Sequence, residues 1–193
     1  MKKLVKLRWK VRLEIKRCRW CNEENKKYVD YHDNEWGVLN TSDDYLFEML
    51  ILEGFQAGLS WECILNKRGS FKKAYDNFNL DKVCNYDNKK IEELINNKDI
   101  VRNKLKIKSS IINAKIFREI KLEYNGFINY LNSFTDGNIV YEYDKTRSEL
   151  SDRISNDLKK RGMKFVGSTI IYSYLQAIGI INSHEKTCYL YGR

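Results

Sequence analysis

The sequence predicts an all-α fold. After residue 40, apolar residues recur three and four positions apart through most of the chain, which is the spacing of amphipathic helices. Serine and aspartate residues that suit helix N-caps precede several of these runs. The sequence contains no internal repeat, low-complexity linker or obvious domain boundary, and its 193 residues suffice for one hydrophobic core.

Residues 5 to 15 are the exception to the helical pattern. Apolar and charged side chains alternate there, as in a half-buried strand. Because no second clear strand follows, we expect this segment to be a loosely attached extension.

The central helix is expected over residues 43–52. Ser42 suits its N-cap, Asp43 and Asp44 suit the positive N-terminal end, and the run from Leu46 to Leu52 is apolar on nearly all sides. A loop is expected over residues 135–145. The other expected helices cover residues 61–66, 71–78, two short segments that begin at Asp81 and Asp87, 102–124, 127–134, 148–161 and 168–181.

Composition and charge limit the classes of protein to consider. With 42% apolar and 32% charged residues, the chain has the composition of a soluble globular protein. No apolar run approaches the ~20 residues of a membrane span, and the first 16 residues lack the features of a secretory signal. We therefore expect a cytoplasmic protein without a membrane partner. The net charge of +9 favours nucleic acid as a partner, although a genome-wide bias towards lysine codons would produce the same charge.

Two histidines and two cysteines near the two ends of the chain form a candidate metal site. Cys18 and His32 lie near the start, whereas His184 and Cys188 are four residues apart near the end, a spacing that places both on one side of a helical turn. Two thiolates and two imidazoles are a common structural zinc set. A clip between these segments would close a very long loop. Alternatively, the histidines are surface residues and the cysteines belong to the core.

The five cysteines do not indicate a disulfide framework, because their number is odd and no export signal precedes them. Cys18 and Cys21 form a Cys-x-x-Cys pair, which could supply two metal ligands or act as a redox pair. The sequence around this pair lacks the strand–helix context of a thioredoxin.

A candidate pocket combines aromatic residues with one carboxylate. Glu53 ends the apolar run of the central helix, and Trp61 follows eight residues later. Several tyrosines lie in the segment 28–37, which also contains His32. Such rings and a carboxylate suit a cationic or electron-poor planar ligand. The alternative is that Trp20, Trp36 and Trp61 are ordinary core residues.

Residues 158–169 predict a hairpin that binds phosphate. A helix is expected to end at Gly162, and Gly167 opens the next one. Free N–H groups at the start of that helix, with basic residues nearby, suit the DNA backbone. An ordinary helical hairpin with solvated lysines is the alternative.

Taken together, these motifs resemble the DNA-3-methyladenine glycosylase I family, in order, from about residue 17 to 190. The matching segments are Arg17-Cys18-Arg19-Trp20, Tyr31-His32-Asp33-Asn34-Glu35-Trp36-Gly37, Leu46-Phe47-Glu48-Met49, Leu52-Glu53-Gly54-Phe55-Gln56-Ala57-Gly58-Leu59-Ser60-Trp61, Lys164-Phe165-Val166-Gly167-Ser168-Thr169 and His184-x-x-x-Cys188.

The resemblance implies a helix-hairpin-helix glycosylase fold over residues 17–193, with residues 1–16 as a basic extension. It implies a monomer that excises 3-methyladenine from double-stranded DNA after flipping the base, in base-excision repair. The implied structural zinc ligands are Cys18, His32, His184 and Cys188, which favours Cys18 over Cys21. The implied base pocket comprises Trp20, Tyr28, Tyr31, Trp61 and Glu53, the last also as catalytic residue, and the implied DNA contacts are Leu59, Lys164, Gly167, Ser168 and Thr169.

One departure from the wider superfamily concerns catalysis. Many of its members carry a catalytic aspartate some fifteen to twenty residues beyond the hairpin, whereas here residues 179–184 read Gly-Ile-Ile-Asn-Ser-His. No hairpin lysine stands out as a Schiff-base nucleophile. We therefore expect a monofunctional glycosylase without strand cleavage. Two other functions stay open: a zinc-stabilised module that binds DNA without chemistry, and a thiol redox protein using Cys18 and Cys21.

Overall fold

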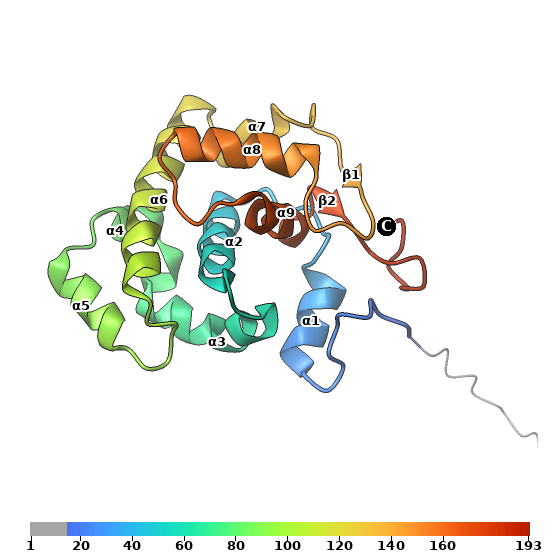
Figure 1. Ribbon diagram of the computed structural model, residues 1–193, viewed down its shortest axis with the longest axis horizontal. Coiled ribbons are helices and arrows are strands. Elements are labelled where there is room, and N and C mark those ends of the chain that lie inside the picture. The colour runs from blue at the N-terminus through green and yellow to red at the C-terminus, as the bar shows by residue number, and fades with distance from the viewer. Residues whose placement is uncertain (1–14) are drawn as a thin grey trace, which may run out of the picture.

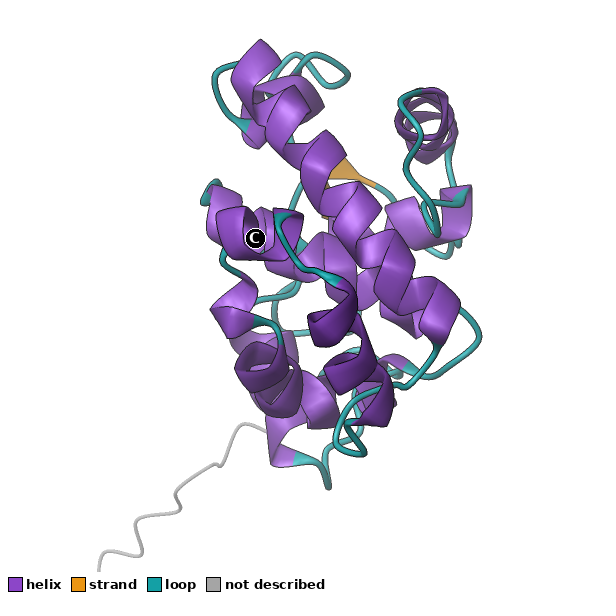
Figure 2. Ribbon diagram, turned by 90° about the vertical axis from the view of Figure 1, so that its left-hand side faces the viewer, coloured by secondary structure: helices purple, strands orange, loops and turns teal. Residues whose placement is uncertain are grey.

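The computed structural model describes residues 15–193, so the strand expected over residues 5–15 lies, apart from Ile15, outside the described residues. The described chain is mostly helical, as the sequence predicts (Figures 1 and 2). Its elements, in order, are α1 (Lys26–Asn34), α2 (Asp43–Gln56), α3 (Trp61–Ala74), η1 (Asp76–Phe78), α4 (Leu80–Cys84), α5 (Asn88–Asn96), α6 (Lys104–Glu123), α7 (Phe127–Asn132), β1 (Val140–Tyr141), α8 (Glu149–Lys160), α9 (Ser168–Ala177) and β2 (Ile181–Asn182).

A short pair of parallel strands corrects the all-α prediction. Val140 of β1 pairs with Ile181 of β2, although the sequence predicts a loop at the first and a helix at the second. The helix stops early because the chain turns at Gly179, where φ is +80° and an added Cβ would lie 2.2 Å from the backbone of Val38 and Leu39. Beyond this turn the chain is extended and pairs with β1.

One further helix and the extents of two others also differ from the prediction. The sequence does not predict α1, whose N-terminus is capped by the side chain of Asn25, which accepts from the backbone N–H of Lys27. α3 is continuous from Trp61 to Ala74, where the sequence predicts two separate helices over residues 61–66 and 71–78. α2 extends to Gln56, so Glu53 lies inside its last turn. This last difference matters most, because it places the carboxyl group on a rigid helix.

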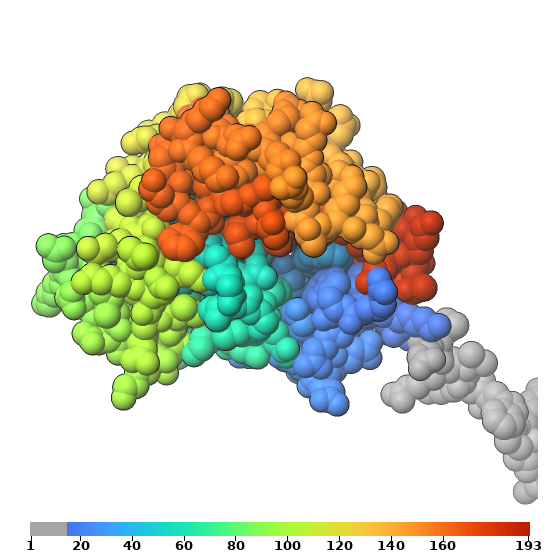
Figure 3. Space-filling model, in the orientation of Figure 1, coloured from blue at the N-terminus to red at the C-terminus, as the bar shows by residue number. Residues whose placement is uncertain are grey.

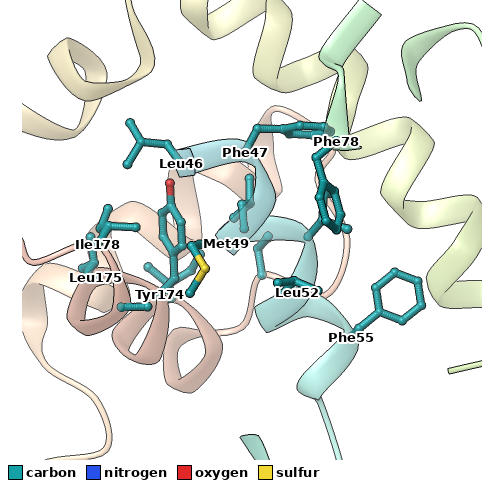
Figure 4. Packing of buried hydrophobic residues seen from close by; sticks show 14 of the residues in the cluster. Leu46, Phe47, Met49, Leu52, Phe55, Phe78, Tyr174, Leu175 and Ile178 are labelled. Carbon is teal, nitrogen blue, oxygen red and sulfur yellow. The ribbon is translucent and has the colours of Figure 1, made fainter. Parts of the chain in front are cut away.

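α2 lies at the centre of the fold, between α9, α6 and α3 (Figure 1). Every residue from Leu46 to Phe55 is buried, which agrees with the apolar pattern of this segment. Figure 4 shows Leu46 and Met49 of α2 near Tyr174 and Leu175 of α9. Because burial of each such side chain contributes about 1.5–3 kcal/mol, the core fixes the position of α2.

No helix in the described part of the chain combines the length and the apolar character needed to cross a bilayer.

Candidate active site and metal centre

A cavity of about 290 Å³ lies beside the last turns of α2. The walls include all five residues that the sequence predicts for a base pocket, which come from α1, α2, α3 and the segment before α1. These residues are Trp20, Tyr28, Tyr31, Glu53 and Trp61.

Glu53 is the unusual group of this cavity. Its side chain is only 2% exposed, and its Oε2 atom has no hydrogen-bond partner. Burial raises the pKa of this carboxyl well above its ordinary value. A buried carboxyl without a partner costs free energy, which indicates that its partner is a ligand.

The aromatic rings line the same cavity as this carboxyl and pack against one another. The ring centroids of Tyr31 and Trp61 are 5.4 Å apart, and those of Trp20 and Tyr28 are 5.2 Å apart in an edge arrangement. Burial raises the pKa of Tyr28 to about 12, so its hydroxyl is protonated at neutral pH. The cavity thus offers aromatic faces to a planar ligand and one carboxyl oxygen to its polar edge.

Trp36 belongs to both the core and the cavity. It is buried, as the core alternative predicts, and it also lines the cavity. Its ring lies 4.8 Å from that of Trp20 and 4.7 Å from that of His184. It therefore forms a wall between the cavity and the candidate metal centre.

Sequence reasoning also missed several polar residues of the cavity. Gln56 lies on α2 three positions after Glu53, a spacing that places both on the same helix face and could have identified it. Its Oε1 atom is buried without a partner, as are Nε1 of Trp61 and Oγ of Ser183. No sequence signal identified the other lining residues, which are Asp144, Lys145, Ser173, Gln176, Ser183 and Glu185.

Three of the four predicted metal ligands converge behind the wall of Trp20 and Trp36. The ligand atoms of Cys18, His32 and Cys188 all lie within 4.8 Å of one another, and all three residues are buried. They join the segment before α1, α1 itself and the C-terminal segment. This group is suited to hold a metal ion.

His184 lies next to this group, with its ring centroid 5.4 Å from that of His32. The segment 183–193 consists of turns, so the predicted helical turn for His184 and Cys188 is wrong. The ring has room because a Cβ at Gly37 would lie 2.7 Å from its Cε1 atom. Burial and the nearby His32 lower the pKa of His184 to about 4, which leaves the imidazole neutral.

The hydrogen bonds around the histidines fit a metal ion. Nδ1 of His184 lies 2.9 Å from Oδ1 of Asn182, and its buried Nε2 has no partner. Nδ1 of His32 lies 2.8 Å from Oδ1 of Asp33, while its Nε2 faces Sγ of Cys188 at 3.5 Å. The backbone N–H of Cys18 also lies 3.2 Å from Nε2 of His32 and donates to it. In both histidines Nδ1 is held by an acceptor, which leaves the lone pair of Nε2 directed at the group.

The sulfur atoms have partners of the same kind. The backbone N–H of Glu185 donates to Sγ of Cys18, and that of Leu190 donates to Sγ of Cys188, both at 3.5 Å. Burial raises the pKa of Cys18 to about 12, so a cation is needed to stabilise its thiolate. Because a thiolate accepts hydrogen bonds, two N–H groups directed at the buried sulfurs fit the thiolate form of both cysteines.

Cys21 does not belong to the group. It is buried, its Sγ approaches the backbone oxygen of Tyr28 at 3.9 Å, and burial raises its pKa to about 11. A protonated buried thiol is a poor nucleophile, which argues against the redox alternative.

The predicted DNA contacts lie on two neighbouring loops of one face. Leu59, in the turn between α2 and α3, is 43% exposed, and Gly58 before it has φ of +80°. Lys164 and Thr169 are exposed near the start of α9, where Gly167 is the N-cap residue. Figure 3 shows the turquoise turn below the orange-red hairpin on this face.

Comparison with known proteins identifies the family of this chain. The family model for methyladenine glycosylase matches residues 20–191. DNA-3-methyladenine glycosylase 1 of Escherichia coli strain K12 is 40% identical over 185 residues, which cover 92% of this chain and 97% of that protein. DNA-3-methyladenine glycosylase of Haemophilus influenzae is 34% identical, with 89% and 96% covered.

Solved structures give the same result. A crystal structure of 3-methyladenine DNA glycosylase I superposes with a TM-score of 0.86 at 37% identity, covering 91% of this chain and 99% of that one. The Staphylococcus aureus enzyme, studied for its recognition of 3-methyladenine, superposes with a TM-score of 0.82 at 30% identity, covering 86% and 92%. The chain therefore belongs to the methyladenine glycosylase family.

Proposed function

We propose that this chain excises 3-methyladenine from alkylated double-stranded DNA, as a monofunctional glycosylase of base-excision repair. It hydrolyses the N-glycosidic bond after the base has turned out of the duplex into the cavity. The observation that carries this proposal is the buried carboxyl of Glu53, which has no protein partner and faces an aromatic cavity. A module that only binds the DNA backbone has no use for such a group.

The chemistry of the lesion matches this cavity. Methylation at N3 gives the adenine ring a formal positive charge, so the base leaves readily with the electron pair of the glycosidic bond. Water then adds to the sugar carbon and releases a proton. Entry of the cationic base favours ionisation of Glu53, which gives up its proton to solvent, and the carboxylate then accepts a hydrogen bond from the N–H edge of the base. The rings of Trp61 and Tyr31 attract the cationic face. A strong general acid is unnecessary.

The two exposed loops contact different parts of the duplex. α8, the hairpin and α9 act as a helix-hairpin-helix motif, in which the free N–H groups from Gly167 to Thr169 bind a phosphate and Lys164 adds positive charge. Leu59 enters the space that the flipped base leaves. These roles are supported by the exposure of the loops on one face.

A structural zinc ion is part of the proposal. Cys18, His32, His184 and Cys188 would hold it as a closed, four-ligand site. Such an ion supplies no step of the reaction; it ties the two ends of the chain together and supports the cavity wall formed by Trp20 and Trp36. Its donor set and the unpaired Nε2 of His184 support this assignment.

The test is the release of free 3-methyladenine from methylated duplex DNA by the purified chain, with undamaged DNA as control. We expect release of the base, an intact abasic strand, and a large loss of activity in Glu53→Ala. Absence of release above background from the unsubstituted chain would refute the enzymatic function. Strand cleavage that persists after removal of contaminating nucleases would refute the monofunctional reaction.

A further inference from the structure

Lys106, near the start of α6, is a lysine buried inside the protein. It is only 7% exposed, and its Nζ atom donates hydrogen bonds to the backbone oxygens of Phe55 at 2.8 Å and Ala57 at 2.5 Å. No carboxylate forms an ion pair with it among the described residues. Its partners are instead the last carbonyl groups of α2, at the negative end of the helix, where a cation is favoured.

The two carbonyl groups belong to the residues that lead directly into the turn at Gly58 and Leu59. The turn itself is closed by a hydrogen bond from the N–H of Leu59 to the oxygen of Gln56 at 2.6 Å, and no side chain packs on Gly58, since nothing lies within 4 Å of its Cβ position. The ammonium group of Lys106 thus fixes the direction in which the chain leaves α2, and with it the position of Leu59.

Asn113 lies seven residues after Lys106, two turns along the same face of α6. It is also buried, and its side chain forms two hydrogen bonds with the backbone of Lys164. Nδ2 donates to the oxygen of Lys164 at 2.8 Å, and the N–H of Lys164 donates to Oδ1 at 2.9 Å. The second partner of α6 is therefore the hairpin between α8 and α9.

Phe165 lies between the contact that Lys106 makes with the end of α2 and the contact that Asn113 makes with the hairpin. Its ring centroid lies 5.9 Å from Nζ of Lys106, its Cβ lies 3.8 Å from the Cβ position of Gly54, and its φ of +56° is a conformation that a phenylalanine adopts at a cost in free energy. The end of α2, the hairpin and α6 thus form one connected support beneath the DNA-facing surface.

We propose that Lys106 and Asn113 are positioning residues that set the spacing between the Leu59 turn and the phosphate-binding hairpin. The inference rests on the proposed function, since it assigns these loops to the duplex. Both loops must engage the same DNA at once: the hairpin at a phosphate and Leu59 in the base stack. A rigid helix between them removes the cost of ordering two independent loops on binding, and a displacement of about 1 Å is enough to slow such a reaction about 100-fold.

Lys106→Met tests this role, because it keeps the length of the side chain and removes the ammonium group. We expect kcat/KM on methylated duplex DNA to fall about tenfold or more. We expect affinity for free 3-methyladenine, followed by tryptophan fluorescence, to stay within twofold of wild type, because Lys106 does not line the base cavity. Lys106→Arg should restore part of the activity, and Lys108→Met, at an exposed position of the same helix, is the matched control for loss of one charge.

A double-mutant cycle with Leu59→Ala separates positioning from general stability. If Lys106 acts through Leu59, adding Lys106→Met to Leu59→Ala should cost clearly less than Lys106→Met alone. A fully additive loss, wild-type activity of Lys106→Met, or a parallel loss of free-base binding would each overturn the proposal.

Asn113→Ala provides a second test if Lys106→Met does not fold. Its affinity for a duplex that contains an abasic-site analogue should fall about tenfold, while free-base binding stays within twofold of wild type. Unchanged duplex binding would overturn the spacing role. This measurement requires no chemistry, so it is distinct from failure of the proposed function, which is absence of base release by the unsubstituted chain.

Discussion

The cysteine–histidine group and the aromatic cavity share one aromatic wall, yet they differ in how many of their buried polar atoms have hydrogen-bond partners. Trp20 lies 5.2 Å from the ring of His32 on one side and lines the cavity on the other. In the cysteine–histidine group, Nδ1 of each histidine, Nε2 of His32 and both sulfurs have hydrogen-bond partners, whereas Nε2 of His184 has none. On the cavity side, Glu53 and Gln56 keep buried oxygen atoms without a partner.

Buried groups with hydrogen-bond partners stabilise the fold, whereas buried groups without partners are available to bind a ligand. A satisfied group such as His32 with Asp33 and Arg17 holds the structure in place; Arg17 donates to both oxygens of Asp33 at 2.8 and 2.7 Å. An unsatisfied group such as Glu53 destabilises the free protein but is ready for a ligand. Changes on the two sides should therefore have different consequences, which the following predictions compare.

Loss of the metal should have the largest effect. We expect elemental analysis to find one zinc ion per chain, and His184→Ala or chelation of zinc to lower the melting temperature by about 10 °C or more. Excision should fall in parallel, because the shared wall loses its support. Cys63→Ser, at a half-buried cysteine outside the group, is the matched control and should retain the ion. Folded, active protein that contains no metal would contradict this assignment.

Glu53→Gln should show the reverse pattern. The substitution keeps the shape but removes the charge that the cationic base requires, so kcat/KM should fall about 10- to 100-fold, as for the loss of a hydrogen bond to a charged group. The melting temperature at neutral pH should stay equal or rise, because an unpaired buried carboxyl is removed. Thermal unfolding and base release, measured on the same preparation, test the pair of effects. A Glu53→Gln variant that stays active, or that is strongly destabilised, would show that Glu53 serves stability rather than function.

The two regions also differ in how far the sequence predicts them. His32 and His184 stand out by residue type, because histidine is scarce in this chain, whereas the choice of Cys18 over Cys21 depends on the family motifs. Glu53 and the aromatic residues are identified through the family motifs. Trp36 was missed as a cavity residue, since a tryptophan that touches both core and cavity has no distinct pattern. Ser173, Gln176 and Ser183 come from α9 and the segment after it, and only the packing of α9 on α2 brings them to the cavity.

The same limit applies to the fold. The helices from α2 onward follow from apolar spacing and capping residues. The pairing of β1 with β2 could not be predicted, because each strand has two residues and depends on the turn at Gly179, which is set by its contact with Val38 and Leu39.

Trp20→Ala tests the shared wall itself. Stacking of a base on an aromatic side chain contributes about 1–3 kcal/mol, so we expect excision to fall about 5- to 100-fold while the zinc content stays at one ion. Trp36→Phe, which keeps a ring between the two regions, should cause a smaller loss. Release of zinc from Trp20→Ala at neutral pH would show that the two regions are not separable, contrary to the comparison.

The most gradual effect should be the pH dependence of stability, where the two regions have opposite signs. Burial alone would raise the pKa of Asp33, but hydrogen bonds from Arg17 and His32 hold this pKa at about 2, below its ordinary value of 3.8. Asp33 therefore contributes stability that is lost as the pH falls from 3.8 towards 2.

The pKa of Glu53 is raised instead, so the folded state retains a proton that the unfolded state releases above about pH 4.5. Its contribution to stability is complete below pH 4.5 and decreases by about 1.4 kcal/mol per pH unit until the raised pKa is passed. Subtracting the unfolding free energy of Glu53→Gln from that of wild type, at each pH from 4 to 8, cancels Asp33 and isolates this slope. A difference that does not decrease with rising pH above 4.5 would mean that Glu53 is ionised or paired in the free protein.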